Sequence, residues 1–126
     1  MFELTIKEKV YQFRFGLGFV REIDKTEKIK GEDGNEHNAG LQYAVAALID
    51  EDPVALSNIL AIANKTESPR VSRDDIDFYL EDENTDLEGL CKELLDFFKN
   101  ANSTKKKTLA VIELVEKERA KQTAEN

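Results

Sequence analysis

The sequence predicts a mainly α-helical (α+β) protein, with an N-terminal β-hairpin followed by five or six helices in one compact domain. The chain has 126 residues, of which 40% are apolar, enough for one modest core but too few for two ordinary domains. Apolar and polar residues alternate over the first fifteen residues, whereas after residue 39 the apolar residues recur at helical spacing. We assign the domain to residues 1–118 and expect residues 119–126, which lack an apolar anchor, to form a frayed tail.

The alternation at the N-terminus is typical of two half-buried strands joined by a polar turn. The apolar positions of the first run are Phe2, Leu4 and Ile6. The second run places three aromatic residues on one face, namely Tyr11, Phe13 and Phe15. A lone two-stranded hairpin is marginally stable in water, so this aromatic face must pack against helices.

Two glycines, Gly16 and Gly18, follow the second strand, where the chain is expected to turn into a short helix. The apolar stripe of that helix consists of Leu17, Val20 and Ile23. The same glycines could begin a nucleotide-binding turn, but the third glycine of that motif is absent, which favours a strand-to-helix corner. The polar segment 30–38 is expected to be an exposed loop.

Capping residues mark the starts of the next helices. A helical pattern begins at Ala39, and Asp52 with Pro53 predicts where that helix gives way to the next, as N-cap and first-turn proline. Two helices joined this tightly should form a helical hairpin. Ser72 then predicts the cap of a short helix, with Asp75 placed to reach back as in a capping box.

Thr85 and Glu88 repeat the capping pattern and are expected to begin a long helix. Its apolar residues are Leu87, Leu90, Cys91, Leu94, Leu95, Phe97 and Phe98. Residues 100–103 should end this helix, and a final helix should run from about Thr104 to Glu118.

These last two helices carry more apolar residues than one small core requires. In the long helix, a sufficient core stripe leaves Leu95 and Phe97 near its two edges. The final helix is apolar around much of its circumference, so it is either sandwiched within its own fold or covered by a neighbouring subunit or partner. The candidate partner-binding residues are Leu95, Phe97, Phe98, Leu109, Ile112, Leu114 and Val115.

The formal charge of −8 is unevenly distributed. Residues 74–96 contain ten acidic side chains and one basic one, so this segment carries −9 and the remainder is nearly neutral. An acid-dominated surface repels phosphate, which counts against binding to nucleic acid. No apolar run approaches the roughly 18 residues of a membrane span, and the N-terminus lacks a signal-peptide layout. We therefore expect a cytoplasmic protein that binds neither nucleic acid nor membrane.

No catalytic residue, cofactor or metal is expected. Cys91 lies among leucines and is interpreted as a buried core thiol. His37 lies in the polar loop, where we expect a solvated side chain, because neither a partner nor a pocket is indicated for catalysis.

Calcium binding is a further possibility that the acidic run raises. Asp82, Asn84, Asp86 and Glu93 have the spacing of EF-hand ligands, but Leu87 occupies the position that requires glycine. The acidic residues are better explained by their position near a helix start, where they favour the positive end of its dipole.

The order of several segments is similar to one known family. These segments are residues 11–23 (YQFRFGLGFVREI), 39–44 (AGLQYA), 69–73 (PRVSR), 81–83 (EDE) and 102–106 (NSTKK). Together they resemble the tail assembly chaperones of long-tailed (siphovirus-type) bacteriophages and of prophages of Gram-positive bacteria. The resemblance covers residues 2–118.

The resemblance implies a non-enzymatic protein that binds the long tape measure protein, keeps it soluble and helps recruit tail tube subunits in the cytoplasm of the bacterial host. It also implies oligomers, a possible longer form made by ribosomal frameshifting, and departure before the virion is mature. Two other classes stay open from the residues alone. The −9 segment suits an acidic inhibitor or DNA mimic that binds a basic nucleic-acid enzyme, and a small enzyme with an unrecognised site is the other.

Overall fold

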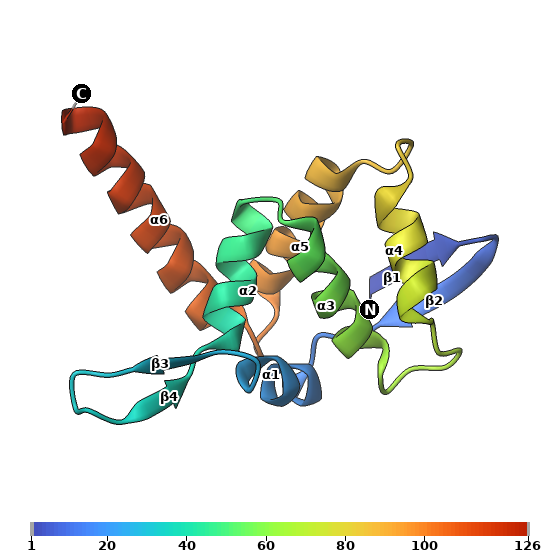
Figure 1. Ribbon diagram of the computed structural model, residues 1–126, viewed down its shortest axis with the longest axis horizontal. Coiled ribbons are helices and arrows are strands. Elements are labelled where there is room, and N and C mark those ends of the chain that lie inside the picture. The colour runs from blue at the N-terminus through green and yellow to red at the C-terminus, as the bar shows by residue number, and fades with distance from the viewer. Residues whose placement is uncertain (1, 126) are drawn as a thin grey trace.

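The computed structural model describes residues 2–125, which form two small antiparallel sheets and six helices (Figure 1). The strands are β1 (Phe2–Ile6), β2 (Lys9–Phe13), β3 (Lys28–Lys30) and β4 (Glu36–Asn38). The helices are α1 (Leu17–Asp24), α2 (Gly40–Ile49), α3 (Pro53–Asn64), α4 (Arg73–Glu81), α5 (Leu87–Asn100) and α6 (Lys105–Glu125). The predicted fold class, an N-terminal hairpin followed by helices, is confirmed.

The β1–β2 hairpin packs on the helices as its alternation predicts. Phe2 pairs with Phe13 and Leu4 with Tyr11, and these side chains are buried on one face. The two-residue turn has positive φ at both Lys7 (51°) and Glu8 (67°), which matches the twist of the strands but is costly for residues other than glycine or asparagine.

A contact with α4 holds this turn. The Lys7 Nζ lies 2.9 Å from a carboxylate oxygen of Asp75 and 4.6 Å from the centre of the Phe78 ring. The Asp75 carboxylate, which the sequence predicts to reach back within its own helix, thus contacts the hairpin turn. The hydrogen bond from Lys7 lowers the pKa of the Asp75 carboxyl.

Phenylalanine rings join the hairpin to α1 and α5. Phe15, which follows β2, is central to this cluster, because its ring lies 4.9 Å from that of Phe19, 5.1 Å from Phe98 and 5.6 Å from Phe97, centre to centre. Most of these pairs are edge-to-face, the arrangement that the charge distribution of aromatic rings favours.

The side chain of Asn64, at the end of α3, joins two further segments. It is fully buried. Its Nδ2 donates to the carbonyl oxygens of Gln12 (2.9 Å) and Pro69 (3.3 Å), and its Oδ1 accepts from the backbone N–H of Val71 (2.7 Å). One amide therefore fixes β2 and the segment leading into α4 against α3.

Two of the three predicted caps are confirmed. The carboxylate of Asp52 accepts from backbone N–H groups at the start of α3, and Ser72 Oγ accepts from Asp75 N. The cap of α5 is Asp86, not Thr85, because the Asp86 carboxylate accepts from Gly89 N at 2.9 Å. The Thr85 hydroxyl donates instead to the Tyr79 carbonyl oxygen and so fixes the loop after α4.

The short helix and the loop that follows it differ in part from expectation. In α1 the buried residues are Phe19 and Ile23, whereas Leu17 is 62% exposed. The helix begins at Leu17, which lies about 160° around the helix from Phe19, so both cannot face the core. Segment 30–38 is exposed, as predicted, but it contributes to a small hairpin, β3–β4, whose turn has Gly34 at φ 82°.

The last helix runs to Glu125, beyond the predicted end near Glu118. Residues 116–125 carry mostly good helix formers, and an ion pair between Lys117 and Glu113 (3.1 Å) lies one turn apart on the exposed side. Local propensity therefore maintains the helix where no core supports it.

Gly40, at the start of α2, provides a test of how closely α1 and α2 approach. A Cβ at this position would lie 1.6 Å from the Ile23 carbonyl oxygen, so the backbone would have to move. We predict that Gly40→Ala lowers the free energy of unfolding by about 1–3 kcal/mol, measured by urea denaturation.

The matched control is Gly18→Ala, because a Cβ on Gly18 in α1 would meet no atom within 4 Å. This control should be neutral or more stable by up to about 1 kcal/mol. Equal effects at the two glycines would show that the approach of α1 to α2 is not tight.

Candidate partner-binding surface

Helix α6 projects from the body of the protein. It begins beside α2 and α5 and then extends away from them, as Figure 1 shows. At its base, Thr104 and Thr108 are buried, and Val111 packs against the core. From Glu116 to Thr123, by contrast, every side chain is exposed. The body therefore covers only the first turns of α6.

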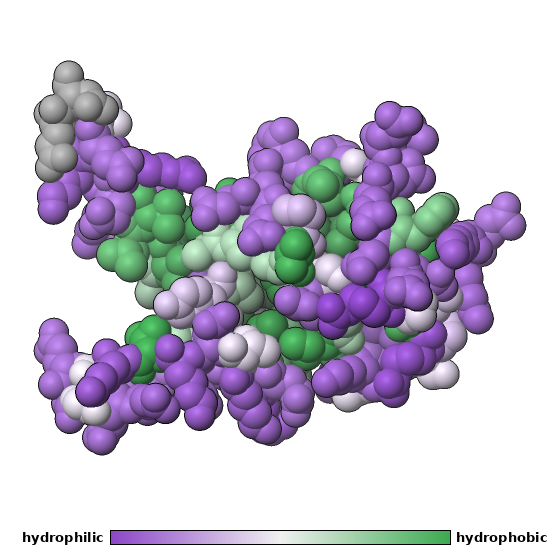
Figure 2. Space-filling model, in the orientation of Figure 1, coloured by the Kyte–Doolittle hydropathy of each residue, from purple (hydrophilic) through white to green (hydrophobic). Residues whose placement is uncertain are grey.

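The uncovered part of α6 next to its base is apolar. Leu109 is 52% and Leu114 61% exposed, and three further residues are half-buried. We name these residues the α6 apolar face: Leu109, Val111, Ile112, Leu114 and Val115. Figure 2 shows this part of the helix as hydrophobic surface, with hydrophilic surface towards the C-terminus. Within the described residues, α6 is not sandwiched in its own fold, so the first of the two readings of this helix is wrong.

A notch separates α6 from the β3–β4 hairpin. Both elements project from the same end of the protein, and hydrophobic surface borders the space between them on both sides (Figure 2). On the hairpin, the apolar residue is Ile29, which is 46% exposed. Part of the α6 apolar face can therefore contact a molecule that enters this notch.

The three candidates in α5 contribute less to the surface. Leu95 and Phe97 are half-buried, and the Phe97 ring packs edge-on against Phe2 at 6.4 Å. Phe98 is fully buried between Phe15 and Phe19, so the prediction that it contacts a partner is wrong. The reason is geometric, because Phe98 continues the buried stripe of Leu94 one turn further.

Two grooves were not predicted from the sequence. One, of about 580 Å³, lies where α1, α2 and α3 meet, has alanines among its lining residues, and has the 51% exposed Tyr43 at its edge. The other, of about 270 Å³, lies between α3 and α4 beside Val54, which is 71% exposed. Alanine at several positions of α2 and α3 was the available signal for the first groove. The second depends on how α4 packs, which no local pattern specifies.

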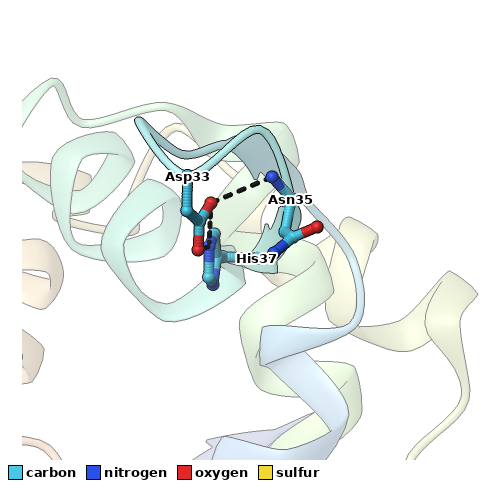
Figure 3. A network of polar contacts seen from close by, with 3 residues as sticks. All are labelled: Asp33, Asn35 and His37. Atoms are coloured by element: carbon cyan, nitrogen blue, oxygen red, sulfur yellow. Dashed lines mark hydrogen bonds and ion pairs between the residues drawn. The ribbon is translucent and has the colours of Figure 1, made fainter.

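His37 is a solvated residue of the β3–β4 hairpin, as predicted. Its Nε2 lies 3.1 Å from both carboxylate oxygens of Asp33, which also accepts from the backbone N–H of Asn35 (Figure 3). This backbone hydrogen bond, followed by the one with His37, lowers the pKa of Asp33. All three side chains are exposed, so the contact organises a turn and not an enclosed site.

The acidic run serves local structure. Asp82 accepts from the backbone N–H of Asn84 in a turn, and Asp86 caps α5. Among the residues that the structure describes, no group of three or more acidic, histidine or cysteine side chains is placed to hold a metal ion.

Cys91 is a buried core thiol, as predicted, with only 1% of its surface exposed. Burial, and to a lesser extent the negative charge of Glu51, raises the pKa of the Cys91 thiol to about 11. The thiol is therefore protonated at neutral pH, whereas a cysteine nucleophile requires the thiolate.

The fold and its surface define a class, a small helical protein whose prominent feature is a projecting helix suited to binding other proteins. Comparison with known families makes this specific. Residues 3–113 match the family described as phage tail assembly chaperone protein, TAC. Because the match covers most of the chain, the protein belongs to this family. Searches of curated proteins and of solved structures gave no match. In the described residues, no helix is long and apolar enough to cross a membrane.

The raised pKa of Cys91 leads to a prediction about its reactivity. At pH 8, iodoacetamide should label the native protein at least about a hundredfold more slowly than the denatured protein, because an unperturbed thiol with a pKa of about 8.5 is then partly ionised. Mass spectrometry over time measures both rates.

The control places the only cysteine on the surface, in Leu17→Cys combined with Cys91→Ser. This thiol should react at similar rates in native and denatured protein. Fast labelling of native Cys91 would show that the core around α5 is open to reagent.

Proposed function

We propose that this phage tail assembly chaperone binds the tape measure protein, its client, and keeps it soluble while the tail assembles in the host cytoplasm. The single observation that supports this best is the α6 apolar face, most of which the rest of the chain leaves at least partly exposed. The role needs no catalysis, since a holder of clients acts by binding alone. Departure from the client before the virion matures completes the proposal.

The physical basis is helix-to-helix packing. A client helix laid along α6 would cover Leu109 and Ile112, which lie about 60° apart around the helix, and it could enter the notch beside the β3–β4 hairpin. Leu114 lies on another side of α6 and would contact a second part of the client. Removing one partly exposed leucine from water is worth on the order of 1 kcal/mol. Each contact is therefore weak.

Weak contacts suit a long client. Several chaperone copies side by side along one tape measure protein would together cover its apolar surface, although each copy would dissociate readily. We include self-association in the proposal because, in the absence of client, a second copy can cover the same apolar residues.

Recruitment of tail tube subunits is proposed to depend on a longer, frameshifted form of the chain. The C-terminal end of α6 lies far from the body (Figure 1). A domain added there would be held clear of the client-binding face. The same helix would then connect the client to the incoming tube subunit.

The alternative of an acidic inhibitor or DNA mimic gains little from the structure. A DNA mimic would need free carboxylates spaced like phosphates. Several acids of the run are committed to local contacts instead, including Asp75 with Lys7, Asp82 in a turn and Asp86 as a cap.

We predict that Leu109→Ser with Leu114→Ser loses the client. Co-expressed with the neighbouring tape measure product, the natural chain should keep the client in the soluble fraction and co-purify with it. The double variant should lose most of the soluble client, because both replaced side chains are exposed and the fold does not depend on them.

The matched control is Leu17→Ser, which replaces an equally exposed leucine on α1. It should retain the client. A second control with Glu81→Gln, Asp82→Asn and Glu83→Gln tests the charged surface. The proposal is wrong if the client is soluble alone, or if only the acidic variant loses it.

A further inference from the structure

The groove between α3 and α4 has the chemistry to receive α6. Pro53, Val54 and Leu80 contribute its apolar lining, while Asp77 and Glu81 contribute acidic groups. The chain segments that border it, 50–54 and 73–83, contain nine acidic residues and a single basic residue, Arg73. It is therefore a partly apolar groove with two carboxylates and one basic residue in its lining, set in strongly acidic chain segments.

The α6 apolar face has the opposite charge around it. Residues 105–121 contain six basic and three acidic residues, a formal charge of +3. Lys105 and Lys106 precede the apolar face and are exposed, and Arg119 and Lys121 follow it. The apolar residues of α6 would meet the apolar lining of the groove, and the basic residues on either side of them would meet the acidic residues of the groove. The two surfaces are therefore complementary.

These surfaces cannot meet within one molecule. Helix α6 is held at its base by α2 and α5, and Figure 1 places it at one end of the long axis, with α4 towards the other end. We propose that α6 of one copy binds the α3–α4 groove of a second copy. This inference rests on the self-association that the proposed function includes, and it specifies the two surfaces and their order.

Such a contact is heterologous, since different surfaces of the two copies meet. It leaves a free groove at one end of a pair and a free α6 at the other, so copies add head to tail and form a ring or an open helical array. Because the same α6 apolar face is proposed to hold the client, a copy seated in its neighbour's groove has that face covered. Client and neighbour therefore compete for α6.

Mixing two defective variants tests the head-to-tail order. The helix variant carries Leu109→Glu and Leu114→Glu, and the groove variant carries Val54→Lys and Glu81→Lys; all four residues are exposed. In sedimentation velocity, the natural protein should associate in the micromolar range. Each variant alone should associate at least about thirtyfold more weakly.

An equimolar mixture should form a dimer and stop there. The helix variant still has an intact groove, and the groove variant still has an intact α6, so one contact forms and no further copy can add. Association of the natural protein should weaken as ionic strength rises from about 0.1 M to about 1 M, because the Debye length falls from about 10 Å to about 3 Å. Leu17→Glu, on α1, is the matched control and should associate like the natural protein.

A mixture that stays monomeric overturns the inference, as does a natural protein that is monomeric throughout the micromolar range. A symmetric contact between the α6 helices of two copies would also contradict the inference, because the helix variant and the groove variant would then form no contact with each other. If either double variant unfolds by circular dichroism, Leu114→Ser or Val54→Ser replaces it in the mixture. Client capture is measured separately, so a head-to-tail assembly that binds no client contradicts only the proposed function, and a monomer that binds client contradicts only this inference.

Discussion

The buried amide of Asn64 is the constraint on which the body of this protein depends. A polar group without water must find partners inside the fold, and this side chain satisfies two carbonyl groups and one N–H from segments that are far apart in sequence. Any displacement of β2 or of residues 69–71 would leave these groups unpaired. The amide therefore sets where the hairpin lies on α3, and the hairpin in turn presents Phe15 to α1 and α5.

The aromatic cluster then explains why most of α6 lies outside the core. Phe2, Phe15, Phe19 and Phe98 fill the space between the hairpin, α1 and α5, so this part of the core is complete without α6. At the base of α6, the small side chains of Thr104 and Thr108 are buried against the body. Of the larger apolar residues, Val111 still packs against the core, whereas Leu109 faces away from it and Leu114 follows more than one turn after Thr108. Their exposure follows from a core that is already closed.

The spacing of apolar residues and the helix-capping residues predicted most of the helices and strands, because both signals depend only on residues close together in the sequence. The hairpin, the α2–α3 turn at Asp52 and the break after Asn100 were all visible in this way. The errors arise where a choice depends on tertiary contacts. Thr85 and Asp86 are both able to cap a helix, and only the Tyr79 carbonyl, brought near by folding, decides between them. Asn64 has no distinguishing local pattern at all.

The same limit applies to the binding surface. The apolar excess of the last helix was evident from the sequence, but periodicity alone cannot say which residues a body covers, and so it included the buried Phe98 together with the exposed Leu109 and Leu114. A helix that is apolar near its base and charged towards its end is poorly suited to remain alone in water. The core leaves these residues partly exposed, and in the contacts proposed above a weak, charge-assisted interface would allow one cover to be exchanged for another. In the proposed role, in which the chaperone holds its client and later releases it, this reversibility follows from a helix that the fold leaves largely outside its core.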